Sequence, residues 1–460
     1  MVKKGRILTT MSDLLDKNQD FPLIVRGIRV NFATEKGMTM ETDEIVRAMR
    51  TERDQLLAKA YHQRLTGYDV PTLLAAGEIK LITGPRRAGK STMAILMLRN
   101  RNFAYLNFDN RKLLDSWDED AVEASLDVVF PGYEFLLLDE VQNLPQWELW
   151  VAQLYRRGRN MVITGSNARM LGSEMATALT GRFLPVEVMP LSLEEALMWQ
   201  ESDEITVLQR EALTDDYLRL GGFPETIKVR EITETYLATL FDAIVLKDMA
   251  MRHRVRRTAE LSRLAAYLVS NIARPMTLRS IMEAVGFSSV STTQKFIEYM
   301  TEPYLFFFLP RYDNKLRLMN RAPRKVYIAD NGFVSAKAFS ISPDNGRLLE
   351  NAVFVELVRR GYKPGFTLFY YRSRNGKEVD FVTRRGVEVE RVIQVCYDMS
   401  QARTRRREID SLTECASELG GGELAIVTRS ESGSAEHGGK TINIMTIGEL
   451  AKWWSDENWK

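Results

Sequence analysis

The stretch "IKLITGPRRAGKSTMAILML" (79–98) decides the fold of the N-terminal part of this chain. Residues 79–83 are mostly apolar and predict a short buried strand. A loop with two glycines follows, and the apolar side chains after Lys90 have helical spacing. Strand, glycine-rich loop and helix in this order are the context that a P-loop requires. We therefore predict a parallel α/β sheet with a phosphate-binding loop at the end of its first strand.

The loop predicts how a nucleotide would be held. Its glycines let backbone N–H groups surround phosphates, and the N-terminus of the following helix favours an anion. Lys90 would reach the β- and γ-phosphates, and the Ser91 hydroxyl would hold Mg²⁺. ATP and Mg²⁺ are thus the expected cofactors. The residues expected to contact them are Gly84, Pro85, Arg86, Arg87, Ala88, Gly89, Lys90, Ser91 and Thr92.

Two later apolar segments end in polar residues. The strand predicted in "EFLLLDEV" (134–141) ends in Asp139, expected to hold Mg²⁺, and Glu140, expected to activate the attacking water. The strand predicted in "NMVITGSN" (160–167) ends in Asn167. That side chain either orients the water or caps the helix predicted after it, and the sequence leaves both open.

Arg182 follows a predicted helix and precedes a predicted strand in "LTGRFLPVEV". A lone arginine is usually a surface charge, but phosphoryl transfer also gains from an arginine that a neighbouring subunit supplies. Further on, "YLRLGGFPE" (217–225) interrupts helical spacing. It predicts a helix-to-helix turn, with a residue that reaches the nucleotide as the alternative.

The segment 276–312 predicts two helices, 278–285 and 290–300, joined by the turn "GFS" and followed by an apolar strand. Helix, turn, helix and wing are a DNA-reading geometry, although such modules also contact proteins. Candidate DNA contacts on the second helix are Ser291, Thr292, Gln294 and Lys295. Those in the wing are Arg311, Lys315 and Arg317, and Arg321, Arg324 and Lys325 add charge after them.

The segment "GKEVDFVTRRGVEVERVIQVCYD" (376–398) predicts two strands around a turn. Arginines flank it, and "ARTRRRE" (402–408) opens the next predicted helix. Such charge predicts DNA held through phosphates and sensitive to salt. The candidate contacts are Arg372, Arg374, Arg405 and Arg406.

Bulk composition limits the classes of function. The chain has 460 residues, 45% of them hydrophobic, and a net charge of only +2, so a nucleic-acid surface would be a local patch. The two cysteines and three histidines show no zinc or disulfide spacing, which predicts a reduced, cytoplasmic protein. No stretch predicts a signal peptide or a membrane span.

The whole set of motifs resembles a prokaryotic, archaeal and bacterial family of AAA+-type ATPases. The matching stretches are "ITGPRRAGKST", "LLLDEVQNLPQWE", "ITGSNARML", "LTGR", "PLSLEEAL", "YLRLGGFPE", "NRAPRKVYIADNGF" and "GKEVDFV". The resemblance covers about residues 50–450 and implies an α/β fold with four parts, while an N-terminal extension of unknown role (1–45) matches nothing in the family. The four parts are an AAA+ P-loop core (46–192), a helical lid (193–258), a winged helix-turn-helix (259–325) and a restriction-endonuclease-like α/β domain (326–460). It also implies a ring, with Arg182 in the next subunit's site.

The same resemblance implies a nuclease metal site with Glu350 and Asp380 as its acids. Gln394 then stands where the family fold has a third acid, and Cys396 where it has a lysine. A neutral thiol cannot supply the positive charge of that lysine, although the acids could still bind Mg²⁺. We therefore expect a degenerate nuclease fold that grips DNA without cutting it.

These expectations converge on a homo-oligomeric ATPase that translocates along or remodels duplex or branched DNA. Two alternatives remain open from the sequence. One is an ATP-regulated, Mg²⁺-dependent nuclease. The other is a nucleotide-gated switch or scaffold with a protein partner.

Overall fold

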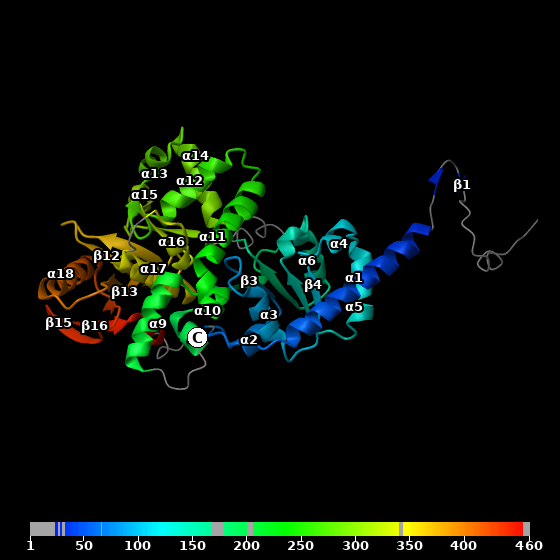
Figure 1. Ribbon diagram of the computed structural model, residues 1–460, viewed down its shortest axis with the longest axis horizontal. Coiled ribbons are helices and arrows are strands. Elements are labelled where there is room, and N and C mark those ends of the chain that lie inside the picture. The colour runs from blue at the N-terminus through cyan, green and yellow to red at the C-terminus, as the bar shows by residue number, and fades with distance from the viewer. Residues whose placement is uncertain are drawn as a thin grey trace, which may run out of the picture.

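The structure is a computed structural model that describes residues 24–25, 28–29, 33–65, 67–167, 179–199, 206–339 and 344–453, with side chains from residue 42 onward. The molecule is elongated, with a parallel sheet towards one end, a six-stranded sheet at the other and helices between them (Figure 1). No helix in the described ranges is both long and apolar enough to cross a membrane.

The N-terminal core is a five-stranded parallel sheet in the order β4-β5-β6-β3-β7. Its strands are β3 (Ile79–Thr83), β4 (Phe103–Asn107), β5 (Phe135–Asp139), β6 (Met161–Gly165) and β7 (Phe183–Glu187). The helical elements around it are α1 (Ala33–Leu57), α2 (Val70–Ala75), α3 (Lys90–Leu98), α4 (Arg111–Asp115), α5 (Glu119–Val129), η2 (Val141–Asn143) and α6 (Trp147–Arg156). A short hairpin of β1 (Ile24–Val25) and β2 (Ile28–Arg29) precedes them.

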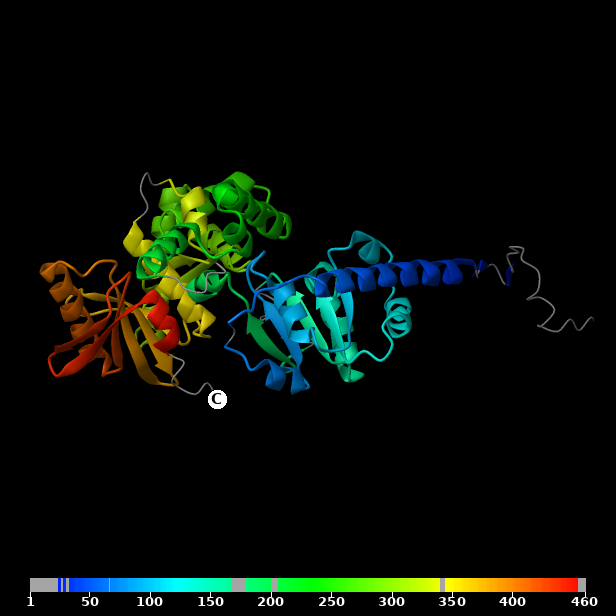
Figure 2. The same cartoon turned by 60° about the horizontal axis from the view of Figure 1, so that its bottom comes forward.

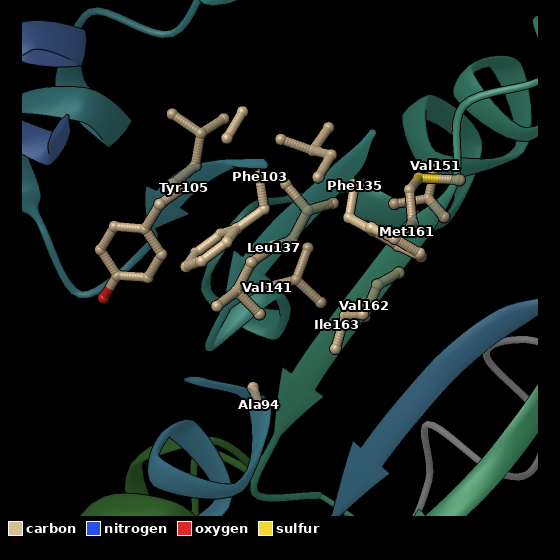
Figure 3. Packing of buried hydrophobic residues seen from close by; sticks show 14 of the residues in the cluster. Ala94, Phe103, Tyr105, Phe135, Leu137, Val141, Val151, Met161, Val162 and Ile163 are labelled. Carbon is tan, nitrogen blue, oxygen red and sulfur yellow. The ribbon is translucent and has the colours of Figure 1, made fainter. Parts of the chain in front are cut away.

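Apolar runs form these strands because the sheet is buried on both faces. Every residue of β3, β5 and β6 is buried. Phe103, Leu137 and Val162 lie on the same face of the sheet in this core (Figure 3). The predicted α/β fold with a P-loop AAA+ core is confirmed. The long helix α1 lies along it and projects beyond it (Figure 2), and Val46 and Met49 of α1 are buried there.

Short helices follow the core: α8 (Leu193–Met198), α9 (Val207–Leu220), α10 (Pro224–Lys228), η4 (Arg230–Ile232) and α11 (Thr233–Ala243). The π-helix η5 (Ile244–Met251) continues α11 directly. Between α9 and α10, the Gly222 N–H donates to Asp330 Oδ2 at 2.7 Å, and a Cβ on Gly221 would lie 1.7 Å from Asp330 Oδ1. The glycines of the GGFPE turn thus let this turn pack on Asp330.

The next unit combines three helices with a three-stranded antiparallel sheet in the order β8-β10-β9. The helices are α12 (Thr258–Val269), α13 (Leu278–Val285) and α14 (Val290–Thr301), and the strands are β8 (Pro275–Met276), β9 (Phe306–Pro310) and β10 (Arg324–Ile328). α15 (Leu316–Arg321) lies in the β9–β10 connection. The predicted domain boundary after residue 325 falls inside β10. Because all of β10 pairs with β9, residues 326–328 belong to this sheet.

The C-terminal unit has a six-stranded mixed sheet in the order β11-β12-β13-β14-β16-β15. Its strands are β11 (Leu368–Arg372), β12 (Glu378–Arg385), β13 (Glu388–Val395), β14 (Glu423–Thr428), β15 (Gly433–His437) and β16 (Lys440–Thr446). Its helices are α17 (Asn345–Arg359), α18 (Ala402–Leu419) and α19 (Ile447–Trp453), while the preceding α16 (Gly332–Lys337) packs on α11. β12 and β13 form the predicted antiparallel pair. The buried apolar residues of α17 from Leu349 onward belong to one apolar cluster, and those of α18 belong to another.

Candidate functional site

The P-loop joins β3 to α3, and its glycines are sterically required. Gly84 has φ +145°, and a Cβ on it would lie 2.1 Å from the Val188 carbonyl oxygen. Gly89 has φ +94° directly before α3 begins at Lys90. The buried Lys90 ammonium donates to the Pro85 carbonyl at 3.0 Å. Burial lowers the pKa of Lys90, and the carboxylate of Glu140, 3.9 Å away, opposes this shift.

Sheet order brings three polar strand ends together, because β6 lies between β3 and β5. Ser91 Oγ donates to Asp139 Oδ1 at 2.8 Å, and the Thr164 hydroxyl donates to the same oxygen. Burial raises the pKa of Asp139, while these hydrogen bonds oppose the shift. A hydroxyl and a carboxylate at this spacing fit the oxygen ligands that Mg²⁺ uses beside a bound phosphate.

Glu140 follows Asp139 with a left-handed backbone, φ +52°. Its N–H donates to Thr164 Oγ1 at 3.0 Å, while Gln142 and Ser166 donate to its Oε2. These contacts hold the carboxylate at the wall of the cavity beside the P-loop. Asn167 is buried after β6, but residues 168–178 lie outside the described residues. Neither interpretation of Asn167 is therefore tested, and both stay predictions.

A cavity of about 370 Å³ opens in front of the P-loop. Its lining combines predicted residues with a set that sequence reasoning missed. The missed set comes from the segment before α2 and from α8 to α10: Tyr61, His62, Arg64, Trp199, Pro224, Glu225 and Lys228. His62 and Trp199 stack with ring centroids 4.5 Å apart, a surface suited to a flat nucleobase. The sequence signalled this wall only through the GGFPE turn, for which a residue that reaches the nucleotide was the alternative interpretation.

Arg64 lines the cavity and contacts the P-loop. Its guanidinium donates to the Ala88 carbonyl of the P-loop at 3.0 Å and to Glu195 Oε1 at 2.7 Å. The Arg64–Glu195 pair is almost fully buried. Burial lowers the pKa of Arg64, and Glu195 counteracts this shift. The pair fixes the P-loop to α8, so the loop's shape depends on residues far away in the sequence.

Arg182 lies at the start of β7, where its carbonyl accepts from the Ile79 N–H at 2.9 Å. The P-loop leaves the opposite end of β3, and β3 and β7 are parallel. Arg182 is therefore at the far edge of the sheet from its own nucleotide site, with its guanidinium 5.7 Å from the Tyr155 ring centroid. Contact with a nucleotide would have to involve another subunit.

In the C-terminal part, Glu350 and Asp380 come together as predicted, but around an unexpected partner. The ammonium of Lys325, from β10, lies 3.0 Å from Glu350, 2.9 Å from Glu378 and 2.8 Å from Asp380. Lys325 is 2% exposed, so the prediction that it adds charge to an exposed wing needs correction. Burial opposes the charge on Lys325, yet Asp380 and Glu350 outweigh it and raise the pKa of Lys325 well above its usual value.

The carboxyl group of Glu350 also accepts from the Tyr327 hydroxyl at 2.7 Å. Burial, and then the neighbouring Asp380, raise the pKa of Glu350 to about 7. Within the described ranges, no three His, Cys, Asp or Glu side chains form a group that could hold a metal ion. Glu350 and Asp380 as metal ligands therefore stay a prediction, while their observed partner is an ammonium.

Gln394 and Cys396 point away from this cluster. Gln394 donates to Glu408 of α18 at 2.9 Å, and Cys396 packs in the apolar cluster beneath α18. Both side chains lie on the side of the sheet that α18 covers. Burial raises the pKa of Cys396 to about 11, so this thiol stays neutral near pH 7. The ammonium near the acids thus comes from a different strand, β10.

Comparison with known proteins places the parts of the chain. A family model described as an AAA domain matches residues 76–197. Models of two domains of unknown function, DUF8612 and DUF4143, match residues 211–344 and 345–448. The break between the latter two coincides with the start of α17.

An uncharacterized protein of Haemophilus influenzae is 30% identical over 342 residues, which are 70% of this chain and 83% of that protein. The chain belongs to the family of this Haemophilus protein. An uncharacterized protein of Methanocaldococcus jannaschii is 29% identical over 383 residues, 79% of this chain and 85% of that protein. A Walker-type ATPase of Pyrococcus abyssi aligns with a TM-score of 0.43 at 15% identity, over 61% of this chain and 99% of that chain.

Outside the AAA domain, the candidate DNA contacts lie on α14, in the wing and on the C-terminal unit. On α14, Ser291, Gln294 and Lys295 are exposed and Thr292 is half-buried; Ser289 caps this helix. In the wing, Lys315 and Arg317 are exposed and Arg311 is half-buried. On the C-terminal unit, Arg372, Arg374 and Arg406 are exposed, while Arg405 is half-buried and pairs with Glu431 at 3.3 Å.

Proposed function

We propose that this chain is an ATP-hydrolysing AAA motor that binds duplex or branched DNA and translocates along it or remodels it. The AAA domain, with its P-loop, polar strand ends and cavity, supports ATP as the fuel. The units that follow are proposed to hold the DNA. A homo-oligomeric ring, in which Arg182 reaches the neighbouring AAA domain, is part of the proposal.

In the proposed reaction, backbone N–H groups of the P-loop and Lys90 bind the phosphates. Ser91 and Asp139 would hold Mg²⁺, which neutralises phosphate charge when it is bound. Glu140 accepts a proton from the attacking water, because its carboxylate is held at the cavity wall beside Lys90. Asn167, at the end of β6, is proposed to orient that water.

The unit from α12 to β10 is proposed to be a winged helix that contacts DNA through α14. It has three helices, a three-stranded antiparallel sheet and a basic connection between β9 and β10. The hydroxyl and amide groups near the start of α14 face solvent and suit phosphates and base edges. The proposal predicts that α14 and the wing approach the same duplex.

One observation carries the DNA part of the proposal: the basic wing is joined to the basic edge of the C-terminal sheet. The Tyr312 N–H donates to the Tyr370 carbonyl at 2.7 Å, and the backbones of Arg311 and Tyr370 form an isolated parallel β-bridge. The Arg384 guanidinium lies 5.3 Å from the Tyr312 ring centroid. Two arginine-rich segments that are distant in the sequence are therefore neighbours in space, which supports the proposal that they follow one phosphate backbone.

A second candidate, an Mg²⁺-dependent nuclease, is favoured by the convergence of Glu350, Glu378 and Asp380 with a lysine. The presence of Lys325 beside these acids weakens the argument that cutting is unlikely because a lysine is missing. However, an ammonium has three donor hydrogens, and Lys325 already lies within 3.0 Å of all three carboxylates. We propose that this internal cation stabilises the fold and that the domain grips DNA without cutting it.

The experiment is a DNA-binding titration at several salt concentrations, with a variant that combines Lys315→Gln, Arg317→Gln, Arg372→Gln and Arg374→Gln. Loss of four phosphate contacts should weaken binding at least about tenfold and reduce the salt slope by roughly 3 to 4. Arg111→Gln, an exposed arginine of the AAA domain paired with Asp115, is the matched control. Unchanged affinity in the fourfold variant would contradict the proposed surface.

A further inference from the structure

Arg86 of the P-loop forms a contact that phosphate binding does not explain. Its Nη1 lies 3.1 Å from Asp248 Oδ1 in the π-helix η5. The Arg86 side chain is 28% exposed and lines the nucleotide cavity, whereas Asp248 is 6% exposed. Among the described residues, Asp248 Oδ2 has no hydrogen-bond partner. This buried carboxylate thus depends mainly on one arginine of the P-loop.

The helix that carries Asp248 is itself unusual. η5 spans eight residues with π-type hydrogen bonding and continues α11 without a break. π-Helical turns are rare and are frequently found at functional sites. A change in the charge around Asp248 would therefore act on a segment that has an alternative helical form.

Beyond η5, the chain contacts the end of α14. His253 stacks on Tyr299 with ring centroids 3.7 Å apart, and its Nε2 lies 2.6 Å from Glu302 Oε2. A second link returns from this end of α14 to the P-loop strand. The Tyr304 hydroxyl donates to Thr83 Oγ1 at 2.9 Å, and Thr83 is the last residue of β3. The end of α14 is thus linked to the P-loop by two routes. One runs through η5, which contacts Arg86, and the segment after it, and the other runs through Thr83, directly before the loop.

We propose that Asp248 is a nucleotide sensor that reads, through Arg86, whether the P-loop holds a polyphosphate and passes this state to α14. Arg86 has two alternative anionic partners, the Asp248 carboxylate and phosphates in the cavity that it lines. A phosphate that draws Arg86 away leaves Asp248 without its main partner, so η5 and the end of α14 rearrange. Because coupling is reciprocal, anything that fixes α14 changes nucleotide affinity. The inference rests on the proposed ATP site but not on the proposed DNA contact.

The test is hydrogen–deuterium exchange of the full chain with and without Mg²⁺ and a non-hydrolysable ATP analogue, together with the analogue's affinity. In the wild type, the analogue should change exchange in residues 244–255 and 290–304. Asp248→Asn should abolish this change and tighten analogue binding about fivefold or more, since Arg86 loses its competing partner. Arg86→Gln should abolish the same change and weaken binding, which supplies a second variant if Asp248→Asn does not fold.

Glu283→Gln is the matched control, because it breaks the exposed Arg279–Glu283 pair of α13 at 3.0 Å. It should respond to the analogue like the wild type. If Asp248→Asn and the wild type respond alike and bind equally, the sensor is refuted while the ATP site stands. If the wild type does not bind the analogue, both the sensor and the proposed ATPase are refuted.

Discussion

At the scale of single residues, Lys325 has the clearest consequence for stability. It is buried against three carboxylates, so its removal would leave like charges together with no cation among them. We expect Lys325→Met to cost about 3 to 5 kcal/mol, as for a broken buried ion pair. The loss in the free energy of unfolding is measured by urea titration, with amide exchange of α17 and β12 as the local probe.

The control for that variant is Lys337→Met. Lys337 is half-buried and pairs at 2.7 Å with Asp242, which is 57% exposed, and ion pairs at the surface contribute at most about 1 kcal/mol. Equal losses for the two variants would show that the cluster around Lys325 does not depend on its ammonium.

Single residues also show what sequence reasoning could reach. Lys90, Ser91, Asp139 and Glu140 were predicted as one site because each stands at a fixed offset from a strand end, and the structure brings them together. Lys325 was placed in the wing because the sequence shows only a basic run there. Its acid partners lie 25 to 55 residues away, and no local pattern reveals which strand approaches them.

At the scale of helices and strands, elements defined by local sequence patterns were predicted, and elements defined by tertiary contacts were not. β3, β5, β6 and the β12–β13 pair were predicted from apolar runs and turn residues, which act locally. The predicted boundary at 325 falls inside β10, because this strand is defined by its pairing with β9, a tertiary contact that no local pattern reveals. The π-helix η5 was missed for a related reason, since its sequence reads as ordinary apolar helix and the Arg86–Asp248 contact spans 162 positions.

At the scale of the whole molecule, the position of Arg182 makes a prediction about assembly. It lies at the sheet edge away from its own P-loop, so only a neighbour's site could use it. Arg182→Ala and Lys90→Ala should each be inactive alone. Mixed together they should regain turnover, because an Arg182→Ala subunit then meets an intact arginine. Full activity of Arg182→Ala alone, or a mixture that stays inactive, would contradict the proposed ring.

The whole chain also links its parts by direct contact. Tyr304 joins the α12–β10 unit to β3, and Tyr312 joins it to the C-terminal sheet. The α12–β10 unit therefore contacts both the strand that leads into the P-loop and the arginine-rich edge of the C-terminal sheet. This arrangement is the physical basis for expecting ATP turnover and DNA contact to depend on each other.

The most direct measurement is ATP turnover by the full chain with and without duplex and four-way-junction DNA, while the same DNA is followed on a gel. We expect DNA to raise turnover several-fold and to emerge unwound or migrated but uncut. Glu140→Gln, the control, should bind ATP and turn it over about a hundredfold more slowly. Turnover that DNA leaves unchanged would contradict the motor and favour a switch with a protein partner. Mg²⁺-dependent cutting that Asp380→Ala abolishes would instead establish the nuclease.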